Sequence, residues 1–218
     1  MPSKAKQRRL ESRNLRRVVG NVREHLKSKE SLGWQQRIQL LLAWGNIGYS
    51  ASARYLQQVE RIFRASDGPV LECGSGATTL LIALLAERYN RKAWTFEHHG
   101  HWSYHVSEVL DALELKQVTV CHAPLKSYGD FEWYDVPSEL PSDFGMVICD
   151  GPPGRIRGGR YGLFPVMGDH LDPACRILLD DTHRKNEQDL IKRWERERRL
   201  GSQPIGLLGS CTELALVS

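Results

Sequence analysis

The sequence lacks three features that would assign it to a protein class at once. Its longest apolar run, near Leu80–Ala86, is far shorter than the ~20 residues that a membrane-spanning helix needs. Its basic start is followed by no apolar stretch, so we expect no secretory signal. Its five cysteines are dispersed and form no C-x-x-C pair, which argues against a disulfide framework and a zinc knuckle. We therefore expect a cytoplasmic protein with reduced thiols.

What the sequence does contain is typical of a globular protein. Its 218 residues are 41% hydrophobic and 26% charged, enough to bury a core without covalent cross-links. The net charge of +4 is uneven, because residues 1–30 hold ten Lys and Arg against three acids. That segment alone carries +7, so the remaining 188 residues sum to −3. The positive charge therefore belongs to the N-terminal segment.

This basic segment has the apolar period of a helix, because Leu15, Val18, Val19, Val22 and Leu26 fall on one helical face. Two interpretations follow. A basic amphipathic helix binds nucleic acid, an anionic membrane or an acidic polymer. Alternatively, the helix docks its apolar stripe on the rest of the protein and exposes its charges. We favour docking, since charge runs are usually solvated faces and no aromatic residue precedes Trp34 to stack on bases.

The rest of the chain changes character near residue 67. Helices are predicted at 34–44 and 52–64, and short apolar strands then alternate with helices. The predicted strands are 70–73, 93–96, 118–121, 144–149, 176–179, 204–208 and 213–217. Such alternation predicts an α/β fold with a Rossmann-like, doubly wound, mostly parallel seven-stranded sheet. The short link between the last two strands predicts one antiparallel edge strand. We divide the chain into a helical extension, residues 1–66, and an α/β domain, residues 67–218.

Acidic residues follow four of the predicted strands. They are Glu72, Glu97, Asp150 and the pair Asp180-Asp181. The carboxyl ends of parallel strands meet at one edge of a doubly wound sheet, where ligands bind. Acids at four strand ends therefore predict a functional site at this edge.

The loop after the first strand has the composition of a ligand-binding turn. In Glu72-Cys73-Gly74-Ser75-Gly76, the two glycines allow a tight turn and a close approach to a ligand. Glu97 follows Gly76 by 21 residues, a spacing that suits a carboxylate binding both hydroxyls of a ribose. A dinucleotide fingerprint would need a third glycine where Thr79 stands. The acid Glu72 also suits an ammonium-bearing ligand better than a pyrophosphate.

These residues resemble a known family. The segment Val70–Gly76 with Glu97 looks like the first two motifs of Rossmann-like (class I) S-adenosylmethionine-dependent methyltransferases. The later segments His122-Ala123-Pro124-Leu125, Trp133-Tyr134-Asp135, Asp150-Gly151-Pro152-Pro153-Gly154 and Leu179-Asp180-Asp181 are similar to a bacterial branch of that superfamily. The resemblance covers about residues 68–218.

The resemblance implies S-adenosylmethionine as cofactor. The glycine loop would wrap its methionine part, Glu97 would hold the ribose, His98 and Ala123 would flank the adenine, and Asp150 would face the sulfonium. The implied cofactor-binding residues are Glu72, Gly74, Ser75, Gly76, Thr78, Glu97, His98, Ala123 and Asp150.

Methyl transfer to a hydroxyl requires that the acceptor lose a proton, which calls for a base or a metal ion. Two arrangements fit. Asp150, Asp180 and Asp181 could bind Mg²⁺, similar to catechol O-methyltransferase-like enzymes, although an Asp stands here where those enzymes have Asn. Alternatively, no metal binds, Asp150 or His183 is the base, and Asp181 or Asp180 orients it. We favour the metal-free arrangement.

Three arginines follow Asp150 in a loop rich in glycine and proline. The guanidinium groups of Arg155, Arg157 and Arg160 match carboxylates and phosphates, which predicts an anionic acceptor. The sequence thus predicts O-methylation, or less favourably N-methylation, of a small or glycan-like acceptor.

Three alternatives remain open. The first is an NAD(P)-dependent oxidoreductase, and the second is a non-catalytic Rossmann-like interaction module with a basic helix. The third, a nucleic-acid methyltransferase, is permitted by the basic N-terminus, but its Asn/Asp-Pro-Pro-Tyr/Phe motif is missing.

Overall fold

A computed structural model describes residues 4–28, 30–45, 51–206 and 209–217 of the chain, with the side chains of residues 4–11 left out. Its helices are α1 (Lys4–Lys27), α2 (Trp34–Trp44), α3 (Ala53–Arg64), α4 (Ala77–Tyr89), α5 (Gly100–Ala112), α6 (Leu163–Met167) and α7 (Lys185–Glu197). Its strands are β1 (Val70–Cys73), β2 (Ala93–Glu97), β3 (Val118–His122), β4 (Leu125–Ser127), β5 (Glu132–Tyr134), β6 (Phe144–Cys149), β7 (Leu171–Asp180), β8 (Leu200–Ile205) and β9 (Cys211–Leu216).

The main sheet has seven strands in the order β3-β2-β1-β6-β7-β9-β8. Neighbouring strands from β3 to β7 run parallel, whereas β9 is antiparallel to both β7 and β8. The predicted fold class is confirmed, including the antiparallel pair at one edge. Within that pair the reversed strand is β9, and β8 is outermost. The strand order reverses between β1 and β6, which is where ligands bind in doubly wound sheets.

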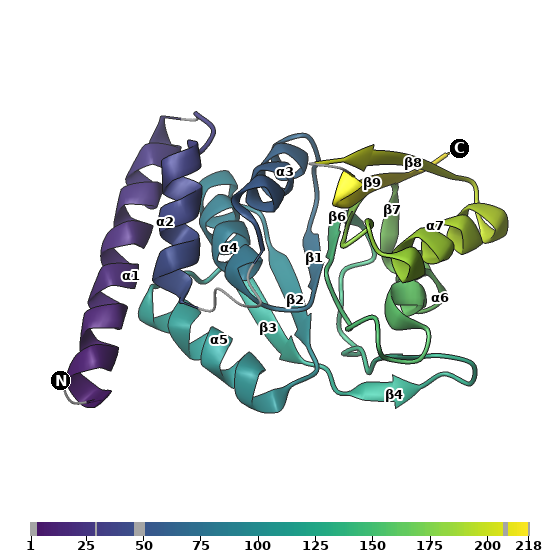
Figure 1. The fold of residues 1–218 in the computed structure, drawn as a ribbon, viewed down its shortest axis with the longest axis horizontal. Helices are drawn as coiled ribbons and strands as arrows, with labels where there is room; N and C mark the ends of the chain where they lie inside the picture. The colour runs from purple at the N-terminus through teal and green to yellow at the C-terminus, as the bar shows by residue number, and fades with distance from the viewer. Residues whose placement is uncertain (1–3, 29, 46–50, 207–208, 218) are drawn as a thin grey trace.

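The sheet is covered on both faces because its strands alternate their side chains. Val70 and Met146 contribute to one hydrophobic core, and their neighbours Leu71 and Val147 contribute to the other. The first core is completed by α1 to α5, and the second by α6, α7 and the β4–β5 hairpin. Figure 1 shows α1, α2 and α5 toward one end of the molecule and α6 and α7 toward the other.

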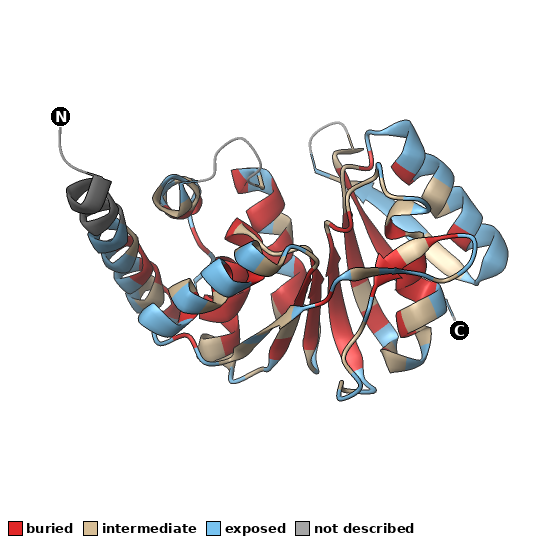
Figure 2. Cartoon of the chain, turned by 90° about the horizontal axis from the view of Figure 1, so that it is seen from below, coloured by how far each residue is buried: buried red, intermediate tan, exposed pale blue. Residues whose placement is uncertain are grey.

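The basic helix α1 docks on the protein, so the interpretation that we favoured is confirmed. Val18, Val19, Val22 and Leu26 are buried in the same core as α3, α4 and α5. The opposite side of α1 is exposed (Figure 2). Arg23 adds an ion pair of 2.6 Å to Glu87 of α4. The hydrophobic core is therefore continuous across residue 66, the boundary that we predicted from composition.

The predicted helices and strands are present in the structure, and several of them begin or end at other residues than predicted. Helix 34–44 and strands 70–73 and 144–149 have the predicted bounds. The prediction for 204–208 was wrong in its bounds: β8 begins at Leu200, and the chain turns at Gly206, whose φ is +81°. Residues 207–208 lie outside the described residues. The β4–β5 hairpin was not predicted. No helix among the described residues is long and apolar enough to cross a membrane.

Candidate active site

The loop between β1 and α4 lies against the loop that follows β6. Gly74 has a φ of +92°, and a Cβ there would stand 3.3 Å from the backbone nitrogen of Gly151. The N–H of Asp150 donates to the carbonyl of Cys73 at 3.0 Å. A Cβ on Gly76, by contrast, would meet no atom within 4 Å. The glycines therefore allow one close backbone contact and leave open space beside the turn.

Glu97, at the end of β2, accepts hydrogen bonds from this loop. Its Oε2 accepts from the backbone N–H of Ser75 at 3.2 Å and from the Ser75 hydroxyl at 2.8 Å. Its Oε1 accepts from the N–H of His99 at 2.8 Å. The indole of Trp102 donates to the Ser75 carbonyl at 3.0 Å, which fixes the loop from the other side. The predicted pairing of the glycine loop with Glu97 is thus present as direct contact.

Two further residues predicted for the cofactor lie beside Glu97. The N–H of Ala123 donates to the carbonyl of Glu97 at 2.8 Å, because β3 pairs with β2. His98 Nδ1 lies 3.2 Å from Glu97 Oε1 yet has no hydrogen-bond partner among the described residues. Partial burial lowers the pKa of His98, so the neutral ring is favoured.

Glu72 does not open onto this loop. Its carboxylate is fully buried and accepts from the hydroxyls of Thr78, Thr79 and Thr95. Burial raises the pKa of Glu72 to about 7, against the effect of these three hydrogen bonds. Glu72 and Thr78 therefore anchor the start of α4 to the sheet.

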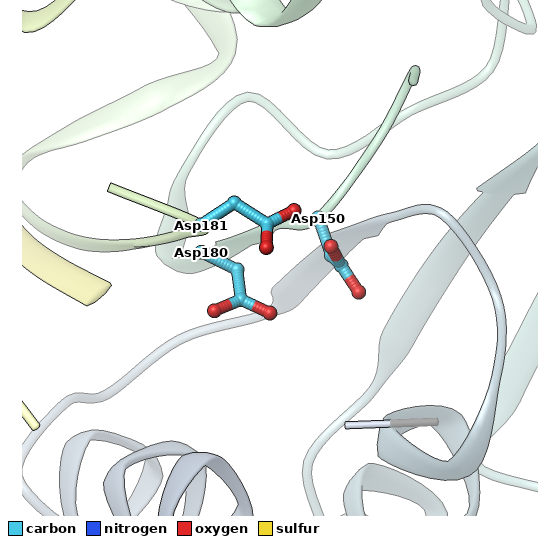
Figure 3. Close-up of side chains that lie close together, drawn as sticks. All are labelled: Asp150, Asp180 and Asp181. Carbon is cyan, nitrogen blue, oxygen red and sulfur yellow. The ribbon is translucent and has the colours of Figure 1, made fainter. Parts of the chain in front are cut away.

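Three aspartates converge at the ends of β6 and β7. Carboxylate oxygens of Asp150, Asp180 and Asp181 all lie within 4.8 Å of one another. Figure 3 shows the three side chains directed toward a common region. They meet because Cys149 of β6 and Leu179 of β7 are in register, so both strands end at the same level. The convergence predicted from the sequence is confirmed.

Arg160 is the cation at the centre of this cluster. One of its terminal nitrogens, Nη2, donates to Asp150 Oδ1 and to Asp181 Oδ2, both at 3.0 Å. The other, Nη1, donates to the backbone carbonyl of Asp180 at 2.6 Å and lies 3.6 Å from Glu187 Oε1. The side chain is 3% exposed. The guanidinium that we predicted to bind the acceptor is thus committed to protein oxygens.

Burial raises the pKa of two of these aspartates, Asp150 and Asp180. Burial, reinforced by the charge of Asp180, raises the pKa of Asp150 to about 8 even though Arg160 opposes the shift. Burial likewise raises the pKa of Asp180 to about 6. A carboxyl group with a pKa near neutrality can exchange a proton at physiological pH.

A cavity of about 810 Å³ opens over the aspartates. Its described lining residues are Ala51, Ser52, Tyr55, Asp150, Pro153, Gly154, Arg155, Arg160, Asp180, Asp181, His183, Arg184, Asn186, Glu187 and Ser210. His183, Arg155 and Arg184 are exposed residues of this lining. Arg157 points elsewhere and donates to the Ser127 hydroxyl of β4 at 3.1 Å. Of the three predicted arginines, Arg155 is the one that stays exposed on the cavity.

Comparison with known proteins finds solved structures of similar fold. No protein-family model matches the chain, and no curated protein sequence matches it. An SAH-bound methyltransferase, PaMTH1 of Podospora anserina, is 12% identical with a TM-score of 0.61, covering 85% of this chain and 86% of that one. A protein of Staphylococcus aureus, provisionally described as a caffeoyl-CoA O-methyltransferase, is 11% identical with a TM-score of 0.60, covering 90% and 97%. A methyltransferase of Geobacter sulfurreducens is 12% identical with a TM-score of 0.57, covering 89% and 95%.

The chain has the fold of class I S-adenosylmethionine-dependent methyltransferases. Within this methyltransferase fold, two lining residues of the cavity were missed by sequence reasoning. Tyr55 belongs to α3, in the segment that we predicted to be a separate extension, and Glu187 belongs to α7. Neither stands in a recognisable motif, so no local signal marked them.

Proposed function

We propose that the protein transfers a methyl group from S-adenosylmethionine to a hydroxyl oxygen of a small or glycan-like acceptor. One observation carries the proposal. The glycine loop with Glu97 and the cavity over the three aspartates meet directly, through the 3.0 Å hydrogen bond from the Asp150 N–H to the Cys73 carbonyl. A donor bound at the first site would therefore lie next to an acceptor bound at the second.

The residues around Glu97 suit the cofactor. The open space beside Gly76, the carboxylate at the end of β2 and the unpartnered Nδ1 of His98 lie together at one edge of the sheet. We assign the ribose to Glu97, the methionine part to Gly74, Ser75 and Gly76, and the adenine to His98 and Ala123. Bound there, S-adenosylmethionine supplies an electrophilic methyl carbon. Glu72 and Thr78 support the loop from beneath.

We assign Asp150 as the base that accepts the proton of the acceptor hydroxyl. Its pKa of about 8 places the proton transfer near physiological pH. Asp181 and Arg160 hold it in place, since Nη2 of Arg160 joins both carboxylates at 3.0 Å. His183, exposed at the cavity rim, is a second group that can take the proton onward to solvent.

The arrangement of charges supports a reaction without a metal. The carboxylate set of Asp150, Asp180 and Asp181 has the ligand chemistry of a Mg²⁺ site. Arg160, however, already places a guanidinium against two of the three carboxylates. A metal ion would have to compete with this buried cation. Activity that is unchanged by EDTA and by added Mg²⁺ is therefore the expected result.

The decisive experiment measures donor binding and methyl transfer separately. Calorimetric titration with S-adenosylhomocysteine should show binding, and titration with NADH or NADPH should show none. Incubation with methyl-labelled donor and a panel of hydroxyl acceptors, followed by mass spectrometry, should show labelled product. Binding of NADPH alone would instead favour an oxidoreductase, and donor binding without any transfer would favour an interaction module.

A further inference from the structure

Three buried polar atoms around the cavity over Asp150 lack any hydrogen-bond partner among the described residues. They are the Tyr55 hydroxyl, Arg160 Nε and Glu187 Oε2. The three residues are 3–4% exposed and all line this cavity. A buried polar atom without a partner is costly, by ~1–3 kcal/mol. Three such atoms around one cavity indicate that a polar ligand satisfies them.

These atoms come from separate parts of the chain. Tyr55 lies in the first turn of α3, Arg160 in the turn before α6, and Glu187 in the first turn of α7. The charges of Asp180, Asp150 and Arg160 act on the Tyr55 hydroxyl. Because the three atoms approach the cavity from different elements, they would contact different sides of one ligand.

The unpartnered atoms require a ligand that both donates and accepts. Arg160 Nε offers only a donor, and a Glu187 carboxylate oxygen offers only an acceptor. The Tyr55 hydroxyl can do either. An ammonium group would leave Arg160 Nε unsatisfied, and a phosphate would face Glu187 with like charge. Hydroxyl groups, which donate and accept at one oxygen, satisfy all three positions.

The lining also argues against a flat aromatic acceptor. Sites for apolar ring systems are lined mostly by hydrophobic and aromatic side chains. Among the described residues that line this cavity, none is Leu, Ile, Val, Met, Phe or Trp. Carboxylates, guanidinium groups, hydroxyls and an amide stand there beside Ala51, Pro153, Gly154 and the rings of Tyr55 and His183. This mixed lining, polar and without large aliphatic side chains, suits a ring that carries several hydroxyls beside its C–H faces.

We infer that the acceptor is a polyhydroxylated ring of the sugar type and that Tyr55, on the N-terminal helical segment, contacts it directly. The inference rests on the proposed function for the identity of this cavity as the acceptor site. The N-terminal segment thereby becomes part of the acceptor site, and the exposed Arg155 at the same cavity accommodates an acidic substituent of the ring.

Saturation-transfer NMR on the full chain tests this inference, with D-glucuronic acid, D-glucose and myo-inositol as one set of probes and catechol and phenol as the other. Signals from the polyols, and none from the phenols, are expected. Tyr55→Phe should raise the dissociation constant of the bound polyol roughly 3–10-fold. Because the buried hydroxyl has no protein partner, this variant without ligand should melt no lower than the wild type. Tyr104→Phe is the matched control, since Tyr104 is exposed on α5, and should change nothing.

Binding of catechol without binding of any polyol overturns the inference, as does a Tyr55→Phe variant that binds the polyols as well as the wild type does. Neither result touches the proposed methyl transfer, which is judged by S-adenosylhomocysteine binding and labelled product. Conversely, polyol binding by a chain that transfers no methyl group would sink the proposed function and leave Tyr55 as a sugar contact.

Discussion

Ser75 donates both its backbone N–H and its hydroxyl to one carboxylate oxygen of Glu97, at 3.2 and 2.8 Å. The two residues stand 22 positions apart: Ser75 lies on the loop after β1, and Glu97 is the last residue of the neighbouring strand β2. Glu97 has its other oxygen on the N–H of His99. This pair joins the glycine loop to the second strand end.

Glu97→Gln should weaken S-adenosylhomocysteine binding by roughly 10–100-fold, because hydrogen bonds to a charged group are worth about 1.5–3 kcal/mol. Glutamine keeps the size of the side chain and removes its charge. Calorimetric titration measures the effect. Glu139→Gln, at an exposed loop position, is the matched control and should bind like the wild type. Equal affinity in the two variants would refute Glu97 as the ribose anchor.

Asp150→Asn should reduce kcat for methyl transfer by about 10²–10⁴-fold while leaving cofactor affinity within twofold, since an amide cannot accept the acceptor's proton. In the wild type, the rate should rise with pH and level off above about 8, where Asp150 loses its proton. A pH–rate profile at saturating substrate gives both results. A flat profile between pH 6 and 9 would rule out Asp150 as the base.

The same raised pKa predicts how stability depends on pH. The folded state binds the Asp150 proton more tightly than the unfolded chain, whose aspartates titrate near ~3.9. The stabilisation that this bound proton gives the folded state is complete below pH ~4 and is lost as the pH rises through about 8. As the pH rises from 5 to 8.5, the melting temperature of Asp150→Asn should therefore increase relative to that of the wild type. Parallel thermal scans at four pH values test this, and a constant difference would contradict it.

Arg155 and Arg160 should behave differently although both stand in one loop. Arg155→Ala should raise the KM for an anionic acceptor several-fold and change stability by less than about 0.5 kcal/mol, because the side chain is exposed. Arg160→Met should cost about 3–5 kcal/mol, because it leaves Asp150 and Asp181 without their buried cation. Denaturant unfolding and acceptor kinetics on both variants separate the two roles. A stable Arg160→Met protein would contradict the structural role.

Shortening a buried side chain of α1 should show that the basic helix contributes to the stability of the fold. Leu26→Ala should lose about 2–5 kcal/mol of unfolding free energy, since Leu26 is 1% exposed in the shared core. Leu42→Ala on α2, where the side chain is 58% exposed, is the control and should change stability by less than about 0.5 kcal/mol. Urea unfolding measures both. Similar stability of the two variants would mean that α1 contributes little.

Local pattern was enough to predict most of the fold. Strands β1 and β6 could be placed to the residue because each is a short, mainly apolar run, followed by Gly74 in one case and by Asp150-Gly151 in the other. The antiparallel pair at the edge followed from a connection too short for a crossover. Strand β8 was misplaced because its residues Leu200–Ile205 are mixed in polarity and follow α7 with little separation. The β4–β5 hairpin was missed because its strands have three residues each and too few positions to show alternation.

The sequence by itself determined that Glu97 and the glycine loop belong together and that the aspartates gather at one edge, because parallel strands bring their carboxyl ends to one level. Only the tertiary structure decided where each side chain at that edge points. It turned Glu72 inward onto three threonines, committed Arg160 to the aspartates, and brought Tyr55 and Glu187 to the cavity from helices distant in sequence. The reason is physical: strand order follows from periodicity and connection length, whereas the partner of a buried charge depends on packing between segments that no local pattern links.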